Sequence, residues 1–311
     1  MSQVHQAISV VAILMLFIFG LQSLSHELQK LIGDRLKGAF SWLLDNYWRS
    51  VLAGIFTTAI VQSSSAVTAL VVSLVGKKIV PLSRALAVIV GANVGTASTA
   101  FIVSFRLEFL GAYLIVLGSI LSFWNARARV IGKSLFFFGF ILFVLDQLGF
   151  QLRNHFEPNY FRNLIAEPGQ LGFLQTFWGF LLTVIFQSSS LTTGFIVTLG
   201  SQGFIDLQDA IFFILGANVG TTSTGLIASV GFDRVAKQAA LGNFLFNLWS
   251  AFLIFPFVIP FSSVVSQLAH GNTALAIAFS HLFFNLILLL LVTPFLNLFE
   301  RLLKSLLPDK G

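Results

Sequence analysis

The stretch Gln62-Ser63-Ser64-Ser65 lies in otherwise apolar surroundings and occurs a second time as Gln187-Ser188-Ser189-Ser190. Each copy is followed by the phrase Gly-Ala-Asn-Val-Gly-Thr, at residues 91–96 and 216–221. The first glutamine and the first glycine are 29 residues apart in both copies (91 − 62 and 216 − 187), so the block recurs at an offset of 125 (187 − 62). The rest of the chain is organised around this duplicated polar block.

The composition excludes a soluble protein. Of the 311 residues, 56% are hydrophobic and 10% are charged, whereas a soluble domain carries about 25% charged residues. Several apolar stretches approach the roughly 20 residues that cross a bilayer as a helix. The runs 135–138 and 286–292 do not alternate as barrel strands would. We therefore expect an all-α polytopic membrane protein with the lipid bilayer as its surroundings.

The residue types narrow the function further. A net charge of +6 would suggest nucleic acid in a soluble protein, but in this apolar chain it indicates loops facing the cytoplasm, and no nucleic-acid partner is expected. Cysteine is absent, which excludes disulfides and thiolate metal sites. The sequence contains no hydrolase triad, nucleotide-binding loop or cluster of metal ligands. We expect neither an enzyme nor a bound cofactor.

The apolar segments predict two repeats, 1–150 and 171–311, joined by a polar loop at 151–170. In the first repeat an amphipathic interfacial helix is expected at 25–49. Spanning helices are expected at 6–24, 82–104, 109–124, 134–150, 207–230, 236–260 and 274–299.

Each Gln-Ser-Ser-Ser copy separates two apolar runs that are too short to span. These runs predict a re-entrant hairpin around each copy, since non-helical backbone at membrane depth is tolerated only inside protein or beside a cavity. The glycines and asparagines of the second phrase favour helix interruption. The segments 82–104 and 207–230 are therefore expected to be helices broken near their middle.

Basic residues predict that the two halves are inverted. The loop 125–133 carries Arg127, Arg129 and Lys133 without an acid, which places it in the cytoplasm. Counting crossings from this loop puts the end of the first broken helix outside and the end of the second, near Arg234, inside. The same count places the C-terminus in the cytoplasm. Inverted repeats with paired broken elements are typical of secondary transporters that bind their substrate at the midplane.

The serine clusters stand before apolar helices and could present helix N-termini to a ligand. Serine is a favoured N-cap, and free N–H groups at the positive end of a helix dipole bind oxyanions. The hydroxyl and amide oxygens also suit a hard cation. Because neither phrase contains a charged residue, a co-bound cation would help to neutralise a bound phosphate.

Structural explanations of the same residues exist. The spacings Gly91-x-x-x-Gly95 and Gly216-x-x-x-Gly220 are typical of close helix packing, and Ser or Thr can join helices by hydrogen bonds. The duplication in inverted halves favours a binding site. The pair His281 and Asn285 could relay protons or serve as structural hydrogen bonders.

The paired phrases resemble those of the type II sodium-dependent phosphate cotransporter family in its bacterial form. The resemblance covers about residues 10–299 and includes the Phe-Asn phrases 243–247 and 281–285. It implies a plasma-membrane symporter that imports inorganic phosphate by alternating access, driven by sodium. It implies sodium sites at Gln187, Ser188, Thr221 and Thr224 and, by the offset of 125, at Gln62, Ser63, Thr96 and Thr99. Phosphate is expected at the motif serines and asparagines, namely Ser63, Ser64, Ser65, Ser188, Ser189, Ser190, Asn93 and Asn218.

Three alternatives stay open from the sequence. The substrate could be another tetrahedral oxyanion such as sulfate or arsenate, and the coupling ion could be a proton. A passive anion channel would be a different class of protein. The channel would conduct phosphate downhill without sodium, whereas the symporter would accumulate it.

Overall fold

The computed structural model describes residues 3–43, 46–104, 109–155 and 172–308. Within these ranges the side chains of residues 3–4, 7, 29, 31–43 and 127 are not described. All regular structure in the described ranges is helical, which confirms the predicted all-α class. The first half contains α1 (Gln3–Leu43), α2 (Tyr47–Val61), α3 (Ser64–Gly76), α4 (Leu82–Ser104), α5 (Leu110–Ser122) and α6 (Ala126–His155). The second half contains α8 (Phe173–Phe186), α9 (Ser189–Ser201), α10 (Leu207–Ser229), α11 (Arg234–Ile254), α12 (Val258–Leu268), α13 (Thr273–Val292) and α14 (Leu296–Leu306).

Six helical segments within the described residues are long and apolar enough to cross a membrane. They are Ile8–Leu28, Leu82–Ser104, Ala128–His155, Leu207–Ser229, Arg234–Leu268 and Thr273–Leu306. The last two each contain a 3-10 turn, Phe255–Phe257 and Thr293–Phe295. These turns coincide with Pro256 and Pro294, because proline cannot donate the backbone hydrogen bond of a helix interior.

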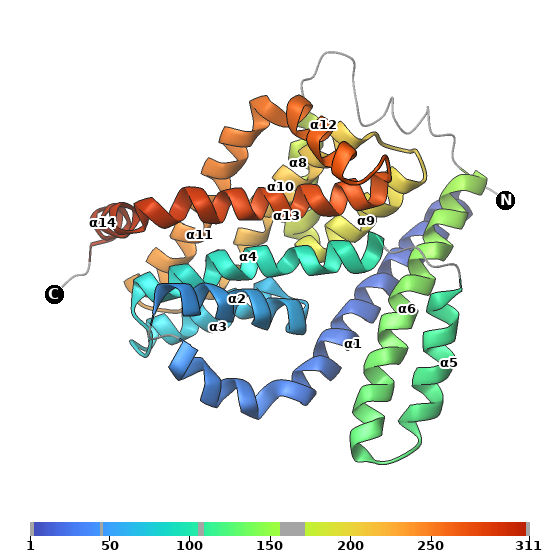
Figure 1. Ribbon diagram of the computed structural model, residues 1–311, viewed down its shortest axis with the longest axis horizontal. Helices are drawn as coiled ribbons and strands as arrows, with labels where there is room; N and C mark the ends of the chain where they lie inside the picture. The colour runs from blue at the N-terminus through green and yellow to red at the C-terminus, as the bar shows by residue number, and fades with distance from the viewer. Residues whose placement is uncertain (1–2, 44–45, 105–108, 156–171, 309–311) are drawn as a thin grey trace.

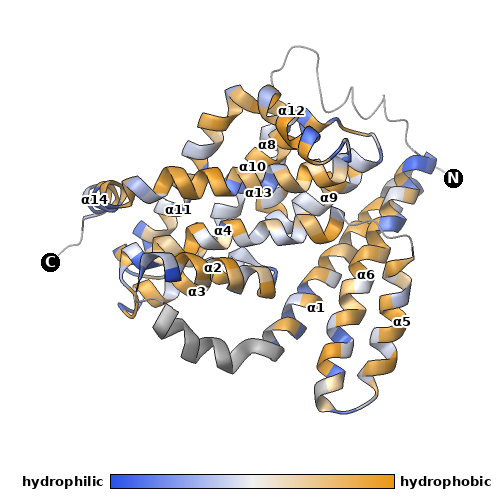
Figure 2. Ribbon diagram, in the orientation of Figure 1, coloured by the Kyte–Doolittle hydropathy of each residue, from blue (hydrophilic) through white to orange (hydrophobic). Residues whose placement is uncertain are grey.

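The helices form two groups (Figure 1). In one group α5 and α6 stand side by side against α1. In the other, α4, α10 and α13 run through the middle and pack with α3, α9 and α11. The helices are hydrophobic over most of their length, as Figure 2 shows. Since α1 also packs on α2 and α9, it joins the two groups.

The duplicated sequence block is also a duplicated set of helices. The bounds of α3 and α9 differ by 125 residues at both ends, and so do those of α4 and α10. In each copy a two-residue turn follows the preceding short helix, α2 or α8. Two pairs of short helices around the Gln-Ser turns therefore match the predicted local pairing, while their depth in a membrane and their relative orientation stay predictions.

The predicted breaks in the two long helices are wrong. Both α4 and α10 are continuous over 23 residues. A Cβ atom added at Gly91 would lie 2.0 Å from the Val51 carbonyl oxygen, and one at Gly216 would lie 1.8 Å from that of Thr176. The glycines thus permit close contact of α4 with α2 and of α10 with α8, and this packing outweighs their poor helix propensity.

The predicted loop at 125–133 is also wrong. Asn125 Oδ1 accepts a hydrogen bond from the backbone N–H of Ala128 at 2.9 Å, and helix α6 begins at Ala126. Arg129 and Lys133 therefore lie on the first turns of α6. Arginine, alanine and lysine are good helix formers, and the glycine of this stretch, Gly132, lies where an added Cβ would be 2.5 Å from the Ser122 backbone nitrogen, so it permits close packing on α5.

The segment 109–124 is not a spanning helix. Its helical part, α5, has 13 residues and is roughly 20 Å long at the usual rise per residue, whereas the hydrocarbon core is about 30 Å thick. The crossing count that placed the two faces used this segment, so the sidedness of the chain stays a prediction.

Two further boundaries differ from expectation. The predicted division between 6–24 and 25–49 is absent, because α1 is one helix to Leu43. The interfacial character of its second part depends on side chains that lie mostly outside the described residues. The predicted loop 151–170 begins later, since α6 continues to His155, and residues 156–170 lie outside the described part of the chain.

Candidate functional site

The two Gln-Ser turns have the same backbone geometry. Gln62 and Gln187 end α2 and α8 in the left-handed region, with φ of 56° and 52°. Positive φ is uncommon outside glycine, and it reverses the chain so that the next residue can begin a helix. Ser63 Oγ accepts from the Ala66 N–H at 3.2 Å, and Ser188 Oγ accepts from the Leu191 N–H at 3.3 Å. Both serines are N-caps, so a motif serine caps each helix as predicted, and the helices begin at Ser64 and Ser189, two residues before the expected starts.

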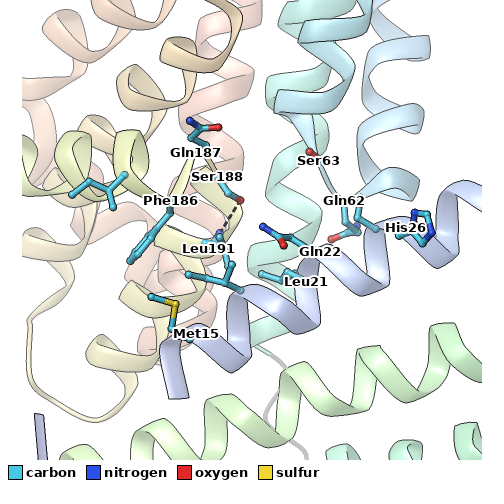
Figure 3. Close-up of a pocket in the computed structure, with 13 residues that line it drawn as sticks. Met15, Leu21, Gln22, His26, Gln62, Ser63, Phe186, Gln187, Ser188 and Leu191 are labelled. Carbon is cyan, nitrogen blue, oxygen red and sulfur yellow. Dashed lines mark hydrogen bonds between the residues drawn. The ribbon is translucent and has the colours of Figure 1, made fainter. Parts of the chain in front are cut away.

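Both turns line one pocket of ≈ 680 Å³ (Figure 3). Gln62 and Ser63 border it on one side, and Gln187 and Ser188 border it on the other. Helix α1 runs past both turns and forms a further wall. Apolar side chains complete the lining, namely Met15, Ile18, Leu21, Ile185, Phe186 and Leu191.

Three side chains from different elements meet behind the first turn. Thr99 Oγ1 on α4 donates to Gln62 Oε1 at 2.7 Å and lies 3.2 Å from Ser190 Oγ on α9. The Gln62 amide nitrogen donates to Ser98 Oγ at 3.1 Å and to the Ala59 carbonyl oxygen. This buried cluster connects the first hairpin to the helix that follows the second turn.

One further hydrogen bond joins the first helix pair, α2 and α3, to the turn of the second pair, α8 and α9. Ser65 Oγ donates to the backbone carbonyl oxygen of Gln187 at 3.1 Å. Together with the Thr99–Ser190 contact, it holds residues from both halves at one place, as the predicted shared site requires.

Seven other predicted site residues lie outside the described pocket lining, and most of them hydrogen-bond to the backbone of their own helix. Thr96 and Thr221 donate to the carbonyl oxygens four residues earlier, and Thr224 donates to the Thr221 carbonyl oxygen. The Asn218 amide donates to the Ile214 carbonyl oxygen, whereas the Asn93 amide donates to Asn243 Oδ1 at 3.3 Å. Ser64 and Ser189 are buried in the first turns of α3 and α9. None of these seven side chains is in the described lining of the pocket.

The pocket combines helix N-termini with uncharged donors and acceptors. The first turns of α3 and α9 begin at the pocket, and the positive ends of their dipoles favour an anion there. The amide and hydroxyl oxygens of both turns suit a hard monovalent cation. No group of three or more His, Cys, Asp or Glu side chains that could hold a metal ion occurs among the described residues. The donors and acceptors of the site are therefore suited to an oxyanion and an alkali cation.

The contribution of α1 to the pocket was not predicted from the sequence. Gln22, Ser25 and His26 line the pocket beside the two turns. Their spacing of three and four residues within the apolar segment Ile8–Leu28 places them near one face of a helix. Polar residues at this spacing in a spanning helix were the available signal.

The buried pair His281 and Asn285 lies on α13. His281 Nδ1 is 3.3 Å from Thr193 Oγ1 on α9, and the Asn285 amide donates to the His281 carbonyl oxygen at 2.9 Å. His281 is absent from the described pocket lining. In this structure it connects α9 to α13, which corresponds to the structural alternative of its two predicted roles.

The chain matches the family model described as Na+/Pi-cotransporter over residues 16–149 and 152–290. YjbB of Salmonella typhimurium, provisionally named an inorganic phosphate export protein, is 31% identical over 95% of the chain. The chain spans 54% of the length of that relative. The uncharacterized protein YqeW of Bacillus subtilis is 28% identical, over 97% of this chain and 99% of its own length.

Bovine sodium-dependent phosphate transport protein 2B is 36% identical over 104 residues, which are 32% of this chain and 15% of that protein. No solved structure matches the chain. The family model covers both Gln-Ser turns and, from residue 16 onward, the helices that contribute residues to the pocket. The chain therefore belongs to the Na+/Pi-cotransporter family.

Proposed function

We propose that this protein is a sodium-coupled symporter that imports inorganic phosphate by alternating access. The observation that carries the proposal is the pocket shared by two equivalent turns, each capping a helix with a serine. Two helix N-termini at one pocket are suited to a tetrahedral oxyanion, because each presents N–H groups and a partial positive charge.

Phosphate would bind at the motif serines, and sodium would bind at oxygens next to them. The cluster of Gln62, Thr99 and Ser190 supports a cation position, since it already gathers three side-chain oxygens. By the offset of 125, the equivalent position would use Gln187, Thr224 and Ser65, next to the Ser188 cap. Because α4 and α10 are unbroken, side-chain oxygens rather than unwound carbonyls would contact the ion.

The direction of transport follows the gradients in a symporter of this kind. An inward sodium gradient would drive phosphate import, whereas high internal phosphate with a weak sodium gradient would drive efflux through the same site. The name of the Salmonella relative favours export as the second candidate. Measuring flux in both orientations of the gradient separates the two directions.

We further propose that the repeats 1–150 and 171–311 are inverted in the plasma membrane, with a cytoplasmic C-terminus. The natural absence of cysteine permits single-cysteine labelling without a background. Cysteines at Lys78, after α3, and at Gly203, after α9, should react from opposite faces of the membrane. A cysteine at Ser305 should react from the cytoplasmic side. Labelling of Lys78→Cys and Gly203→Cys from the same face would contradict the inversion.

Phosphate uptake into proteoliposomes tests the function. With sodium outside, the protein should accumulate phosphate above its external concentration, and replacing sodium by choline should abolish accumulation. Unchanged uptake in choline would refute sodium coupling, and a dependence on a proton gradient would identify protons instead. Downhill flux without accumulation would indicate a channel. Competition by sulfate or arsenate would measure selectivity among oxyanions.

A further inference from the structure

The polar face of α1 is the part of the pocket that the repeated phrases do not explain. Phe17, Leu21 and Leu24 are buried and hold the helix against the protein. The Phe17 ring lies over Gly194 of α9, where an added Cβ would be 2.7 Å from the ring. This contact fixes the position of α1 along α9.

The polar residues that follow this anchor line the same pocket as both turns. In Figure 3 the Gln22 side chain lies between Ser188 and Gln62, and His26 lies on the far side of Gln62. Gln22, Ser25 and His26 line the pocket with the two turns. A glutamine amide can donate two hydrogen bonds, and a protonated histidine donates two and carries a positive charge. Both side chains are therefore suited to an oxyanion.

His26 is the one titratable side chain among the described residues of this lining. A phosphate held only by serine hydroxyls and helix N-termini would retain most of its charge in a partly apolar pocket, and uncompensated charge is costly there. A cationic imidazole would reduce this cost through a charge-assisted hydrogen bond. A polar and ionisable pair inside a spanning segment also indicates function by default.

Charged groups share a second pocket with His26. Gln22 and His26 also border a second pocket of ≈ 560 Å³ between α1 and the α5–α6 pair, whose described lining includes Glu27 and Lys133. Glu27 accepts from Lys30 Nζ at 2.8 Å, so its charge is already paired. The described lining from α2, α8 and α9 contributes no charged group to the first pocket. Lys133 of α6 lines this second pocket with His26 and is not in the described lining of the first.

We propose that α1 is the third wall of the substrate site, where Gln22 and His26 bind the transported phosphate and His26 supplies the positive charge that the two serine turns lack. This inference rests on the proposed function. It adds a proton-dependent contact to a site that is otherwise uncharged. A protonated imidazole adds a charge-assisted hydrogen bond to phosphate that a neutral imidazole does not supply.

Phosphate uptake by the full chain in proteoliposomes tests the inference. The phosphate KM of wild type and His26→Gln is compared at about pH 6 and about pH 8, because histidine is the side chain whose charge ordinarily changes across this range. Taking the ratio of the two proteins at each pH cancels the titration of phosphate itself. His26→Gln should raise KM about fivefold at the lower pH and less than about twofold at the higher pH. His26→Lys should keep the lower-pH affinity at both values.

Gln22→Leu should raise the phosphate KM about threefold at both pH values, because one uncharged hydrogen bond is lost. His270→Gln, an exposed histidine between α12 and α13, is the matched control and should behave as wild type. An unchanged KM ratio for His26→Gln, or a fall in kcat alone at both pH values, would overturn the inference. If wild type accumulates phosphate with sodium in those vesicles, the proposed function survives that result. A wild type without uptake would overturn both.

Discussion

The two hairpin turns have the same sequence and backbone but different surroundings. The Gln62 side chain is buried and bonded to Thr99, Ser98 and the Ala59 carbonyl. The Gln187 side chain is exposed, and within the described residues it makes no hydrogen bond. Thr224, the counterpart of Thr99, donates instead to its own helix at Thr221.

The contacts between the hairpins are also unequal. Ser65 donates to the Gln187 carbonyl, and Ser190 lies beside Thr99. The symmetric bonds, from Ser190 to the Gln62 carbonyl and from Thr224 to Ser65, are absent among the described residues. The same four-residue sequence therefore has a buried and hydrogen-bonded glutamine at the first turn and an exposed glutamine at the second, and both turns line the same pocket. Such a difference supports a mechanism in which the halves exchange arrangements.

A third difference concerns side-chain hydrogen bonding between the two helices of each pair. Thr183 on α8 donates to Thr192 on α9 at 2.8 Å. Their counterparts by the offset of 125 are Thr58 and Val67. Among the described residues the buried Thr58 hydroxyl has no hydrogen-bond partner, because valine offers none. A side-chain hydrogen bond between α8 and α9 therefore stabilises the second helix pair, whereas the first turn is hydrogen-bonded to α4 through Gln62 and Thr99.

The largest expected effect concerns a feature that the two halves share. Gly91→Ala and Gly216→Ala would each bring a Cβ within 2.0 and 1.8 Å of a backbone carbonyl oxygen. Backbone cannot move aside cheaply, so each variant should lose about 3 kcal/mol or more of stability. Thermal unfolding in detergent measures this loss. Gly231→Ala is the control, because nothing lies within 4 Å of its added Cβ. A wild-type melting temperature for either variant would show that this packing is not needed.

The sequence predicted the local features and missed those that depend on packing. The serine caps at Ser63 and Ser188 were predictable, because a cap depends on residues within one helical turn. The continuity of α4 was not, because it follows from the approach of Val51 to Gly91 across the sequence. The wall formed by α1 was also hidden, since nothing local to Gln22 or His26 indicates which turn they face. The placement of the predicted sodium and phosphate ligands stays untested.

The next largest effect on stability is expected from the Thr183–Thr192 hydrogen bond between α8 and α9. Thr192→Val removes the partner of the buried Thr183 hydroxyl without changing the side-chain volume greatly. Leaving that group unsatisfied should cost about 1–3 kcal/mol. The loss appears as a lower melting temperature, and the double variant Thr183→Val with Thr192→Val should recover part of it. A single variant as stable as wild type would mean that the 2.8 Å contact contributes nothing.

The exposed and buried glutamines should differ in function and in stability. Gln187→Ala and Ser188→Ala should raise the sodium concentration for half-maximal phosphate uptake about tenfold, equivalent to about 1.4 kcal/mol. Gln187→Ala should leave the melting temperature unchanged, because its side chain is exposed. Gln62→Ala should lower both sodium affinity and stability, since Thr99 and Ser98 lose a partner. Wild-type sodium dependence in both second-half variants would remove those residues from the ion site.

The smallest effect comes from making the first hairpin resemble the second. Val67→Thr places a hydroxyl at the position equivalent to Thr192, where the buried Thr58 hydroxyl lacks a partner. A new hydrogen bond there should raise stability by about 1 kcal/mol, although the Val-to-Thr change gains this only if both hydroxyls become satisfied. Thermal unfolding of Val67→Thr and of Val67→Thr with Thr58→Val separates the bond from the burial of a polar group. Stabilisation that survives the second change cannot come from the Thr58 bond. Stabilisation that disappears would show that the residue at position 67 alone decides whether the two helices of the first pair are joined by a side-chain hydrogen bond, as α8 and α9 are.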